Sequence, residues 1–464
     1  MTDGLTIASI EPAPTDLIKQ AGEHERAGRL DQAAKCIEEA LVAQPDDAEA
    51  NHMKGVIAYR QGRVEDAARH MERSIALAPK STYLRNICEA YRILGRYDEA
   101  LAAGRRGAKL DPKDPICHAN LSVLHYERGE PREAAEEAEK AIALNDALPG
   151  AHLGLAEALL VRGEMERGWE EYEWRYRLLG VPNPMPLKDI PPWDGTHLGE
   201  GSLLLVADQG YGDGIQFARY IPWAKERCGK LLVACSKELQ PLVGQLPGID
   251  TIFDAWDSCP KAHAWQTLSG LPRLHGTRLD NIPGGVPYLR AQPELAAKWA
   301  ARLDILAPHR TARVGLVWAG RPTHMNDRNR SVALSMLAPI TQVDGLTFIS
   351  LQKGPAVDQV GGYFGRAPLI NLGPEIGDFA DSAAIIEALD LVVTVDTSIG
   401  HVAGAMGKPA WIMLPYAPDW RWLRERADTP WYPGVRLFRP PAPKDWATVT
   451  AAVASALEAG EWRL

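Results

Sequence analysis

Five short turns of similar sequence recur between residues 28 and 174, and each begins with glycine. They read GRLDQAA at Gly28, GRVEDAA at Gly62, GRYDEAL at Gly95, GEPREAA at Gly129 and GEMERGW at Gly163. An alanine five residues after the glycine recurs in steps of 34, 33 and 34 residues, at Ala33, Ala67, Ala100 and Ala134, and Gly168 takes its place after a further 34. A fixed period of this length means that one small folding unit is repeated along the chain.

The period and its small residues predict pairs of antiparallel helices of the tetratricopeptide (TPR) type over residues 14–180. The alanines fall where the two helices of a unit cross, since a larger side chain there would push the helices apart. Stacked units form a superhelix whose groove commonly holds an extended peptide or a partner segment, although the array could instead be a spacer or a dimerisation arm. The last unit runs into an aromatic segment, 168–180, which we interpret as a capping helix that docks the array onto the next domain.

A proline-rich segment, VPNPMPLKDIPPWDG, follows the array and predicts a stiff boundary over residues 181–200. Beyond it, short apolar runs alternate with helical patterns, which predicts parallel sheets covered by helices on both faces. The first run, 203–207, leads through a glycine-rich loop with Asp208 and Asp213 into a helix that we expect to begin near Ile215. A second series of strands begins at Arg313, so the sequence predicts two α/β halves, 201–295 and 296–464, with a cleft between them.

Composition and charge narrow the class of protein. Of 464 residues, 46% are hydrophobic and 24% are charged, as in soluble globular proteins, and the formal net charge of -9 argues against nucleic acid or an anionic membrane surface as the main partner. The first residues lack the basic and apolar regions of a signal peptide, and no apolar run approaches the roughly 20 residues that a membrane helix needs. The six cysteines are scattered without a CxxC pair, so we expect free thiols and a cytoplasmic location.

Five stretches of the second part carry a resemblance to a known family: DQGYGDGIQFARYIP, WAGRPTHMNDRNRS, SLQKGP, VDTSIGHVAGAMGKP and PDWRWLRERADTPWYP. Together they resemble the C-terminal module of bacterial TPR-linked glycosyltransferases, which is similar to the family-9 heptosyltransferases and, more distantly, to the O-GlcNAc transferases. The resemblance covers residues 191–464. It implies an α + α/β protein: an all-α TPR superhelix followed by a GT-B module of two Rossmann-like halves, the first on the acceptor side and the second on the nucleotide-sugar side.

Asp213 is the catalytic residue that this resemblance implies. An inverting transfer needs a base that removes the proton of the acceptor hydroxyl while the anomeric carbon is attacked, and the family places a carboxylate for this purpose after a glycine at the cleft. Asp213 could also simply cap the helix that follows it, a position that aspartate favours. Asp208 is a weaker alternative for the base.

The second half supplies the donor-binding side chains, again by the family pattern. They are Arg330, Gln352 and Lys353 in two loops after strands, Asp396, Thr397, Ser398 and His401 at the start of a helix, and Trp420 further on, with Arg328 as an alternative to Arg330. Cations in such loops stabilise the charge of a departing nucleotide diphosphate, a helix N-terminus attracts anions, and an indole can stack on a base or sugar. The alternatives are solvated loop charges, a structural histidine and tryptophans that pack an interface.

The sequence holds no Asp-x-Asp motif and no cluster of residues with metal-ligand spacing. We therefore expect a metal-independent, inverting reaction with no cofactor besides the nucleotide sugar as co-substrate.

The function predicted from these features is transfer of a sugar to a hydroxyl, with Ser or Thr of a protein held by the array as the acceptor. Related TPR-linked transferases act on flagellins, so flagellin is the leading partner that the resemblance implies. Two alternatives stay open. The acceptor could be a glycan or lipid, as for the heptosyltransferases, or the chain could be a non-catalytic TPR adaptor with a degenerate transferase half.

Overall fold

The computed structural model describes residues 13–185, 187, 189–307 and 311–463. Its contacts divide the chain into two compact units that meet in sequence at Leu155 and Ala156. From residue 13 on, the regular elements of the first unit are all helices, and the second unit contains two parallel sheets with helices. The predicted α + α/β class is confirmed. Each unit is described by itself below.

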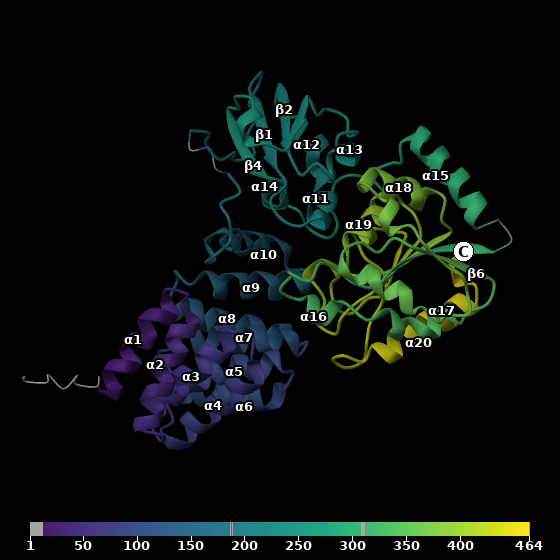
Figure 1. Cartoon of the computed structure of the whole chain (residues 1–464). Helices are drawn as coiled ribbons and strands as arrows, with labels where there is room; N and C mark the ends of the chain where they lie inside the picture. Colours follow the sequence, from purple (N-terminus) through teal and green to yellow (C-terminus); the bar gives the residue numbers. More distant parts are fainter. Residues whose placement is uncertain (1–12, 186, 188, 308–310, 464) are drawn as a thin grey trace, which may run out of the picture. The chain divides into compact units, whose positions relative to one another are not determined.

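The first unit is a row of helical hairpins (Figure 1). Its helices are α1 (Pro14–Arg26), α2 (Leu30–Ala43), α3 (Ala48–Arg60), α4 (Val64–Leu77), α5 (Ser81–Ile93), α6 (Tyr97–Leu110), α7 (Pro115–Glu127) and α8 (Pro131–Leu144), followed by α9 (Pro149–Val161), which runs into the second unit. The recurring alanines of α2, α4, α6 and α8 are all fully buried, at 0% exposure. This burial is the reason for the small residue at each repeat, because it lets the paired helices approach closely.

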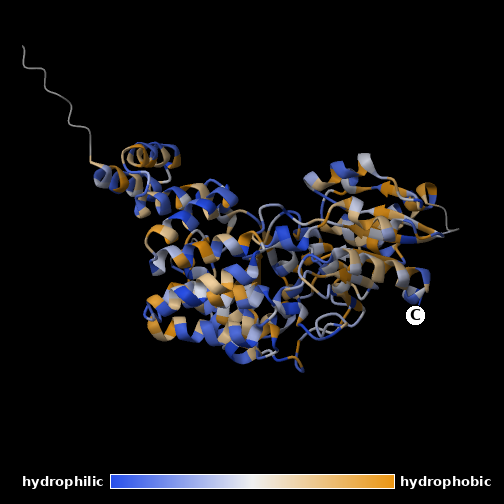
Figure 2. Ribbon diagram, turned by 90° about the horizontal axis from the view of Figure 1, so that it is seen from below, coloured by the Kyte–Doolittle hydropathy of each residue, from blue (hydrophilic) through white to orange (hydrophobic). Residues whose placement is uncertain are grey.

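Hydrophilic and hydrophobic residues alternate around the turns of these helices (Figure 2). The glycine that ends the first helix of each pair adopts a left-handed conformation, with φ between 74° and 83° at Gly28, Gly62, Gly95, Gly129 and Gly163. Any L-residue with a Cβ is strained in this region, so the recurring glycine is a requirement of the backbone.

Substitution of a turn glycine should therefore weaken the array through the backbone alone. No atom lies within 4 Å of the Cβ that Gly62→Ala would add, so we expect a loss of about 1 kcal/mol from strain. Gly150→Ala is the matched control, because Gly150 also has open space but ordinary helical dihedral angles in α9, where alanine is favoured over glycine. Hydrogen exchange of α3 and α4 in the full chain measures the first effect. Equal protection in both variants would contradict the explanation.

The second unit begins with α9's last turns, α10 (Met165–Tyr172) and the 3-10 turn η1 (Glu173–Arg177), and continues into a four-stranded parallel sheet. The strands are β1 (Ser202–Val206), β2 (Lys230–Ala234), β3 (Thr251–Phe253) and β4 (Ala264–Thr267), in the order β3-β2-β1-β4. Helices α11 (Tyr211–Phe217), α12 (Ile221–Lys225), α13 (Gln240–Val243) and α14 (Leu271–His275) connect them, with the 3-10 turn η4 (Leu268–Gly270) before α14.

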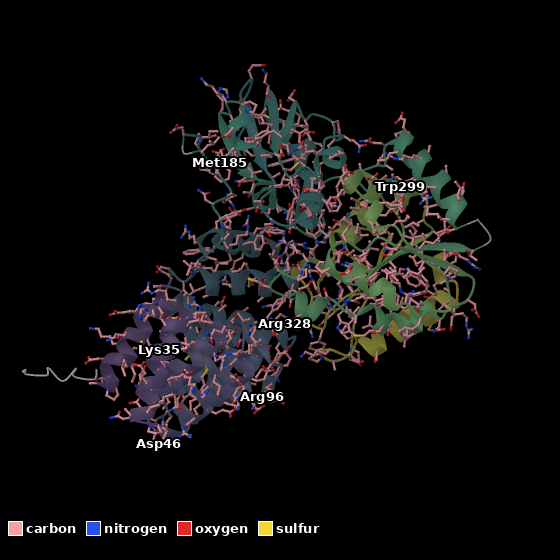
Figure 3. The ribbon with its side chains drawn as sticks, in the orientation of Figure 1. Lys35, Asp46, Arg96, Met185, Trp299 and Arg328 are labelled. Carbon is pink, nitrogen blue, oxygen red and sulfur yellow. The ribbon has the colours of Figure 1, made fainter. Side chains whose placement is uncertain are left out.

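A six-stranded parallel sheet follows, in the order β10-β9-β8-β5-β6-β7. Its strands are β5 (Ala312–Val317), β6 (Leu346–Ser350), β7 (Leu369–Asn371), β8 (Leu391–Val395), β9 (Ala410–Met413) and β10 (Val435–Phe438). The helical segments are α15 (Pro293–Leu306), α16 (Asp327–Arg330), η5 (Leu334–Leu337), α17 (Ala338–Thr341), η6 (Pro355–Gly362), α18 (Phe379–Glu387), α19 (Ser398–Ala405), η8 (Trp420–Trp422) and α20 (Trp446–Glu458). The side chain of Trp299, labelled in Figure 3, ties α15 to α18 through a 2.8 Å bond from its Nε1 to Asp381.

The strand order creates one switch point in each sheet. In the first sheet, β2 and β3 are added on one side of β1 and β4 on the other. In the second sheet, β6 and β7 are added on one side of β5, and β8, β9 and β10 on the other. In open parallel sheets the loops diverge at such a point and leave a crevice at the carboxyl ends of the strands. These two crevices are the places where a ligand site is expected.

The sequence prediction placed most strands correctly but missed β4. Its four residues, AWQT, are too few and too polar to stand out as an apolar run, and the strand is fixed instead by its neighbours. It pairs with β1 over four residues, and the proline-rich segment lies along it, where Trp193 N donates to Trp265 O at 2.7 Å. The helix expected near Ile215 begins earlier, at Tyr211.

Candidate functional site

The crevice between β5 and β8 is the centre of the candidate site. After β5 the chain forms the loop that leads to α16, and after β8 it passes through Asp396 and Thr397 into α19. The start of α11, from the first sheet, packs against α19: a Cβ on Gly212 would lie 2.8 Å from Cδ2 of His401. Gly212 is therefore needed for this close approach, which brings Asp213 to the crevice of the second sheet.

Asp213 lies in the first turn of α11, with its side chain 16% exposed. Its Oδ2 accepts a hydrogen bond from Gly210 N at 3.0 Å, and its Oδ1 accepts one from Nη2 of Arg421 at 2.6 Å. The carboxylate thus both caps the helix and faces a cation of the second half. The helix begins two residues before Asp213, so the carboxylate closes its first turn from within, and the role of Asp213 as a base stays a prediction.

Arg421 was not predicted as a site residue, yet it lies among the charged groups of the crevice. Its side chain is 9% exposed and its Nε lies 3.0 Å from Oδ1 of Asp419. Its Nη1 lies 3.5 Å from Nε2 of His401. The carboxylates of Asp419, Asp213 and Asp396 raise the pKa of Arg421 against the effect of burial, so the guanidinium stays charged. In the sequence, Arg421 is marked only by its place in the PDWRW stretch, in which Trp420 was the predicted ligand contact.

His401 is buried in α19 and is neutral. Burial, with the positive charges of Arg421, Arg219 and Arg330 nearby, holds the pKa of His401 well below its usual value. Because arginine can only donate, Nε2 of His401 is the acceptor, and Nδ1 then donates to the hydroxyl of Tyr432 at 2.9 Å. The ring also stacks on Trp422, with centroids 5.2 Å apart. These contacts fit a residue that sets the spacing between α11 and α19.

The end of β8 carries the other residues predicted for the helix mouth. Asp396 is 7% exposed, and burial together with the nearby carboxylate of Asp419 raises the pKa of Asp396 to about 6. The hydroxyl of Thr397 lies 2.9 Å from that of Thr394, and Ser398 is half-buried at the first position of α19. The structure therefore brings Asp396, Thr397, Ser398 and Asp213 to one crevice.

The loops after β5 and β6 hold the predicted cations. Arg330 is 16% exposed, with its Nε 3.5 Å from Oδ1 of Asp327. Its positive charge acts to lower the pKa of both Asp396 and His401. Arg328, labelled in Figure 3, is exposed on α16. The ammonium of Lys353 is held by backbone carbonyls, Gly373 O at 3.2 Å and Ile376 O at 2.6 Å.

Gln352 is bound to backbone rather than directed at a ligand. Its Oε1 accepts from Trp318 N and Ala319 N, both at 3.0 Å, and its Nε2 donates to Ala319 O at 2.9 Å and Lys353 O at 2.8 Å. A fully engaged amide shapes the loop after β5. The predicted direct contact of Gln352 with a donor would require it to leave these partners.

Trp420 is 2% exposed and is enclosed by aromatic rings of the same unit. It lies edge-on to Trp169 with centroids 5.0 Å apart, and to Tyr172 and Trp431 at 6.0 and 6.1 Å. A ring buried in this way has no open face for a base or sugar, so we assign it to packing. Stacking of Trp420 on a base or sugar, as predicted, would require these aromatic neighbours to move.

The crevice of the first sheet, between β1 and β4, is filled by the chain's own η1. Asp208 follows β1, and its Oδ2 accepts hydrogen bonds from the hydroxyls of Tyr176 at 2.7 Å and Ser269 at 2.6 Å. Arg175 donates from Nη2 to the Ser269 hydroxyl at 2.7 Å. Burial raises the pKa of Asp208, whose side chain is 1% exposed. The structure thus separates the two aspartates of the loop: Asp208 anchors η1, and Asp213 faces the second crevice.

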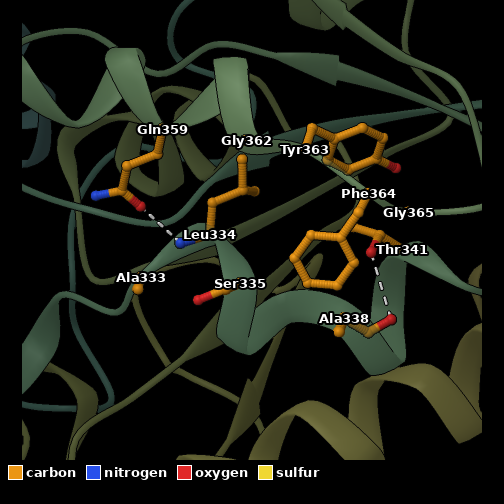
Figure 4. Close-up of a pocket in the computed structure, with 10 residues that line it drawn as sticks. All are labelled: Ala333, Leu334, Ser335, Ala338, Thr341, Gln359, Gly362, Tyr363, Phe364 and Gly365. Atoms are coloured by element: carbon orange, nitrogen blue, oxygen red, sulfur yellow. Dashed lines mark hydrogen bonds between the residues drawn. The ribbon is translucent and has the colours of Figure 1, made fainter.

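Two cavities of the second unit lie away from these residues. One, of 320 Å³, is lined by residues of η5, α17, η6 and the loop to Gly365, among them Gln359, Tyr363 and Phe364 (Figure 4). The other, of 410 Å³, lies between the loop before β6 and the end of α20. Neither contains a residue predicted for the site. In the part of the chain that the structure describes, no cluster of His, Cys, Asp or Glu could hold a metal ion, and no helix is long and apolar enough to cross a membrane.

A tetratricopeptide-repeat family model matches residues 18–82 and 120–173. With the helix pairs and buried alanines, this match makes the chain a TPR-containing protein whose array is followed by an α/β unit. Among curated proteins it is similar to Protein FlbA of Caulobacter vibrioides, with 26% identity over 469 residues, covering 92% of this chain and 75% of FlbA. That likeness extends into both units.

Two further comparisons are confined to parts of the chain. The Hsp70-Hsp90 organizing protein of Triticum aestivum is 36% identical over 114 residues, which cover 24% of this chain and 19% of that protein. Among solved structures, Pseudomonas aeruginosa pilF shows 21% identity and a TM-score of 0.34, covering 37% of this chain and 78% of that chain. A thermophilic TPR protein of Thermus thermophilus shows 22% identity and a TM-score of 0.33, covering 36% of this chain and 92% of that chain.

The raised pKa of Asp396 predicts how stability changes with pH. An exposed aspartate in the unfolded chain titrates near pH 3.9. Between roughly pH 4 and 6, Asp396 is protonated in the folded form but charged in the unfolded chain. The free energy of unfolding therefore rises as the pH falls through this window. Above pH 6 the carboxylate is charged and buried in the folded form, which lowers stability. Asp396→Asn should therefore raise the melting temperature of the α/β unit at pH 7.5, and by less at pH 5.

The matched control is Asp254→Asn, whose carboxylate lies in a surface pair 3.6 Å from Lys237. It should leave the melting temperature almost unchanged at both values, since exposed pairs contribute little. A loss of stability in Asp396→Asn that is equal at pH 5 and pH 7.5 would show that Asp396 is charged and well paired throughout.

Proposed function

We propose that the chain is a glycosyltransferase that moves a sugar from a nucleotide sugar to a hydroxyl group. The observation that carries the proposal is the placement of Asp213, from the first sheet, at the switch-point crevice of the second sheet. A carboxylate from one α/β half faces the ligand crevice of the other, with the cations Arg330 and Arg421 beside it. Such a pairing of a base with an anion site suits group transfer from a negatively charged donor.

The donor would lie at the carboxyl ends of β5 and β8. There the backbone amides at the start of α19 attract a phosphate, and Arg330 and Lys353 add positive charge as the leaving group departs. Lys353 has three N–H donors and gives two to carbonyls, which leaves one for a ligand. In the first sheet's crevice, Arg175 and Tyr176 of η1 bond Ser269 and Asp208 instead.

In the proposed reaction, Asp213 takes the proton of the acceptor hydroxyl as its oxygen forms a bond to the anomeric carbon. The bond from that carbon to the phosphate oxygen breaks, and the electron pair leaves with the nucleotide. Attack from the face opposite the leaving group inverts the anomeric centre. The cations of the second half neutralise the charge that the nucleotide gains.

We further propose that the acceptor is a Ser or Thr of a protein held by the array, with flagellin as the leading candidate. The first helices of successive repeats present a connected polar row: Tyr59 donates to Glu89 at 3.1 Å, Arg92 donates to Glu89 at 2.8 Å, and Arg92 also pairs with Glu127 on the next first helix. A row that crosses several repeats suits an extended peptide, and TPR superhelices use such surfaces to bind partners.

Asp213→Asn tests the catalytic part of the proposal. The amide keeps the shape and can accept hydrogen bonds, but it cannot take a proton, so the transfer rate should fall by about 10² or more. Sugar transfer to the acceptor and donor binding are measured side by side, and nucleotide binding should not weaken. Asp254→Asn, a surface aspartate of the same sheet, should transfer at the rate of the original chain. A normal rate in Asp213→Asn would reduce Asp213 to a helix cap.

Removal of the repeats tests the acceptor part. A chain that begins at Ala147 keeps α9 whole and contains the entire second compact unit, so it should fold and bind the nucleotide sugar. We expect it to lose capture and modification of the protein acceptor, because the first helices that hold the acceptor are gone. If it modifies the protein as well as the full chain does, the array is a spacer and a glycan or lipid acceptor becomes the better candidate.

A further inference from the structure

The carboxylate of Asp213 is engaged by two partners within its own unit. Its two carboxylate oxygens are both occupied, one by Gly210 N at 3.0 Å and one by the guanidinium of Arg421 at 2.6 Å. Any group that approaches Oδ1 of Asp213 has to compete with the N–H of Arg421. The group that the proposed reaction needs is therefore held by a residue 208 positions away in the sequence.

Arg421 is placed where an incoming anion would meet it. It lies beside Asp396, at the end of β8, and 3.5 Å from His401 in the first turn of α19. Three carboxylates, those of Asp213, Asp396 and Asp419, act on this one guanidinium. A planar guanidinium binds phosphate oxygens in the same forked manner as it binds a carboxylate, so Asp213 and a phosphate would compete for the same N–H groups.

The contacts of Arg421 also show how its Nη groups can change partner while the side chain stays in place. Nε lies 3.0 Å from Asp419, and Asp419 Oδ1 accepts from the backbone N of Arg421 at 3.1 Å. Asp419 therefore anchors one edge of the guanidinium. The Nη groups, of which one binds Asp213 and one only approaches neutral His401, are the edge that can change partner.

We propose that Arg421 is a positioning residue that makes Asp213 available only after the donor has bound. The anionic part of the nucleotide takes Nη2 of Arg421 from Asp213, and the released carboxylate then accepts the proton of the acceptor hydroxyl. No covalent bond changes in this step: one charge-assisted hydrogen bond replaces another. The donor must bind before the acceptor can react. The inference rests on the proposed function and names a device within that same site.

A double-mutant cycle on nucleotide binding tests the exchange. The probes are UDP, GDP, ADP and CMP, each beside its nucleoside, measured by titration calorimetry with the full chain and four proteins: the original, Asp213→Asn, Arg421→Gln and the double variant. Asp213→Asn removes the competitor for Arg421, so the nucleotide that binds best should bind about tenfold more tightly, as expected when one charge-assisted bond no longer has to be given up. Its nucleoside should bind as before.

The gain should vanish when Arg421 is absent: in the Arg421→Gln background, Asp213→Asn should change nucleotide affinity by less than about twofold. If Arg421→Gln alone does not fold, the charge-balanced double variant replaces it, and its nucleotide affinity should fall well below that of Asp213→Asn.

The outcomes separate the inference from the function. Nucleotide binding without a gain in Asp213→Asn, an equal gain for the nucleoside, or a gain that persists without Arg421 overturns the exchange and leaves the glycosyltransferase proposal in place. If none of the four nucleotides binds the original chain, the proposed function fails, and the inference fails with it.

Discussion

Buried arginines hold the α/β unit together. Arg175, Arg219 and Arg421 are all buried, and each contacts a segment distant in sequence. Arg175 binds Ser269 after β4, Arg219 donates to a backbone carbonyl 212 residues away, and Arg421 binds Asp213. Removing a guanidinium from water costs several kcal/mol unless its partners are in place, so each of these arginines is stable only in the assembled unit.

The need of buried charges for partners also determines the chemistry of the crevice of the second sheet. Parallel strands bring their carboxyl ends to one edge, and the reversal between β5 and β8 opens that edge for a ligand. The side chains found there are charged and largely buried, which makes their protonation depend on one another: His401 is neutral beside Arg421, and Asp396 shares its surroundings with Asp419. A new anion in this crevice would change the partners of several groups at once.

Much of the fold could be predicted because it repeats or alternates. Alanine and glycine at a spacing of about 34 residues predicted the helix pairs, and the first strand of the α/β part stood out as the apolar run 203–207 before a glycine-rich loop. The strand β4 could not be predicted, since AWQT gains its strand conformation from pairing with β1. The predicted domain limits at 180 and 200 stay a prediction; the compact second unit begins at Ala156 and includes α10 and η1.

The sequence by itself determined the period of the array, the positions of most strands and the loops that end at the crevice. Local patterns suffice for these, because backbone geometry fixes a spacing of 3.6 residues for helices and 2 for strands. The partner of each site residue emerges only when distant segments pack together: Asp208 anchors η1, Asp213 faces the second half, and the ring of Trp420 packs in the interior. These roles depend on partners 30 to more than 200 residues away, such as Arg421 for Asp213, and no local pattern records such a partner.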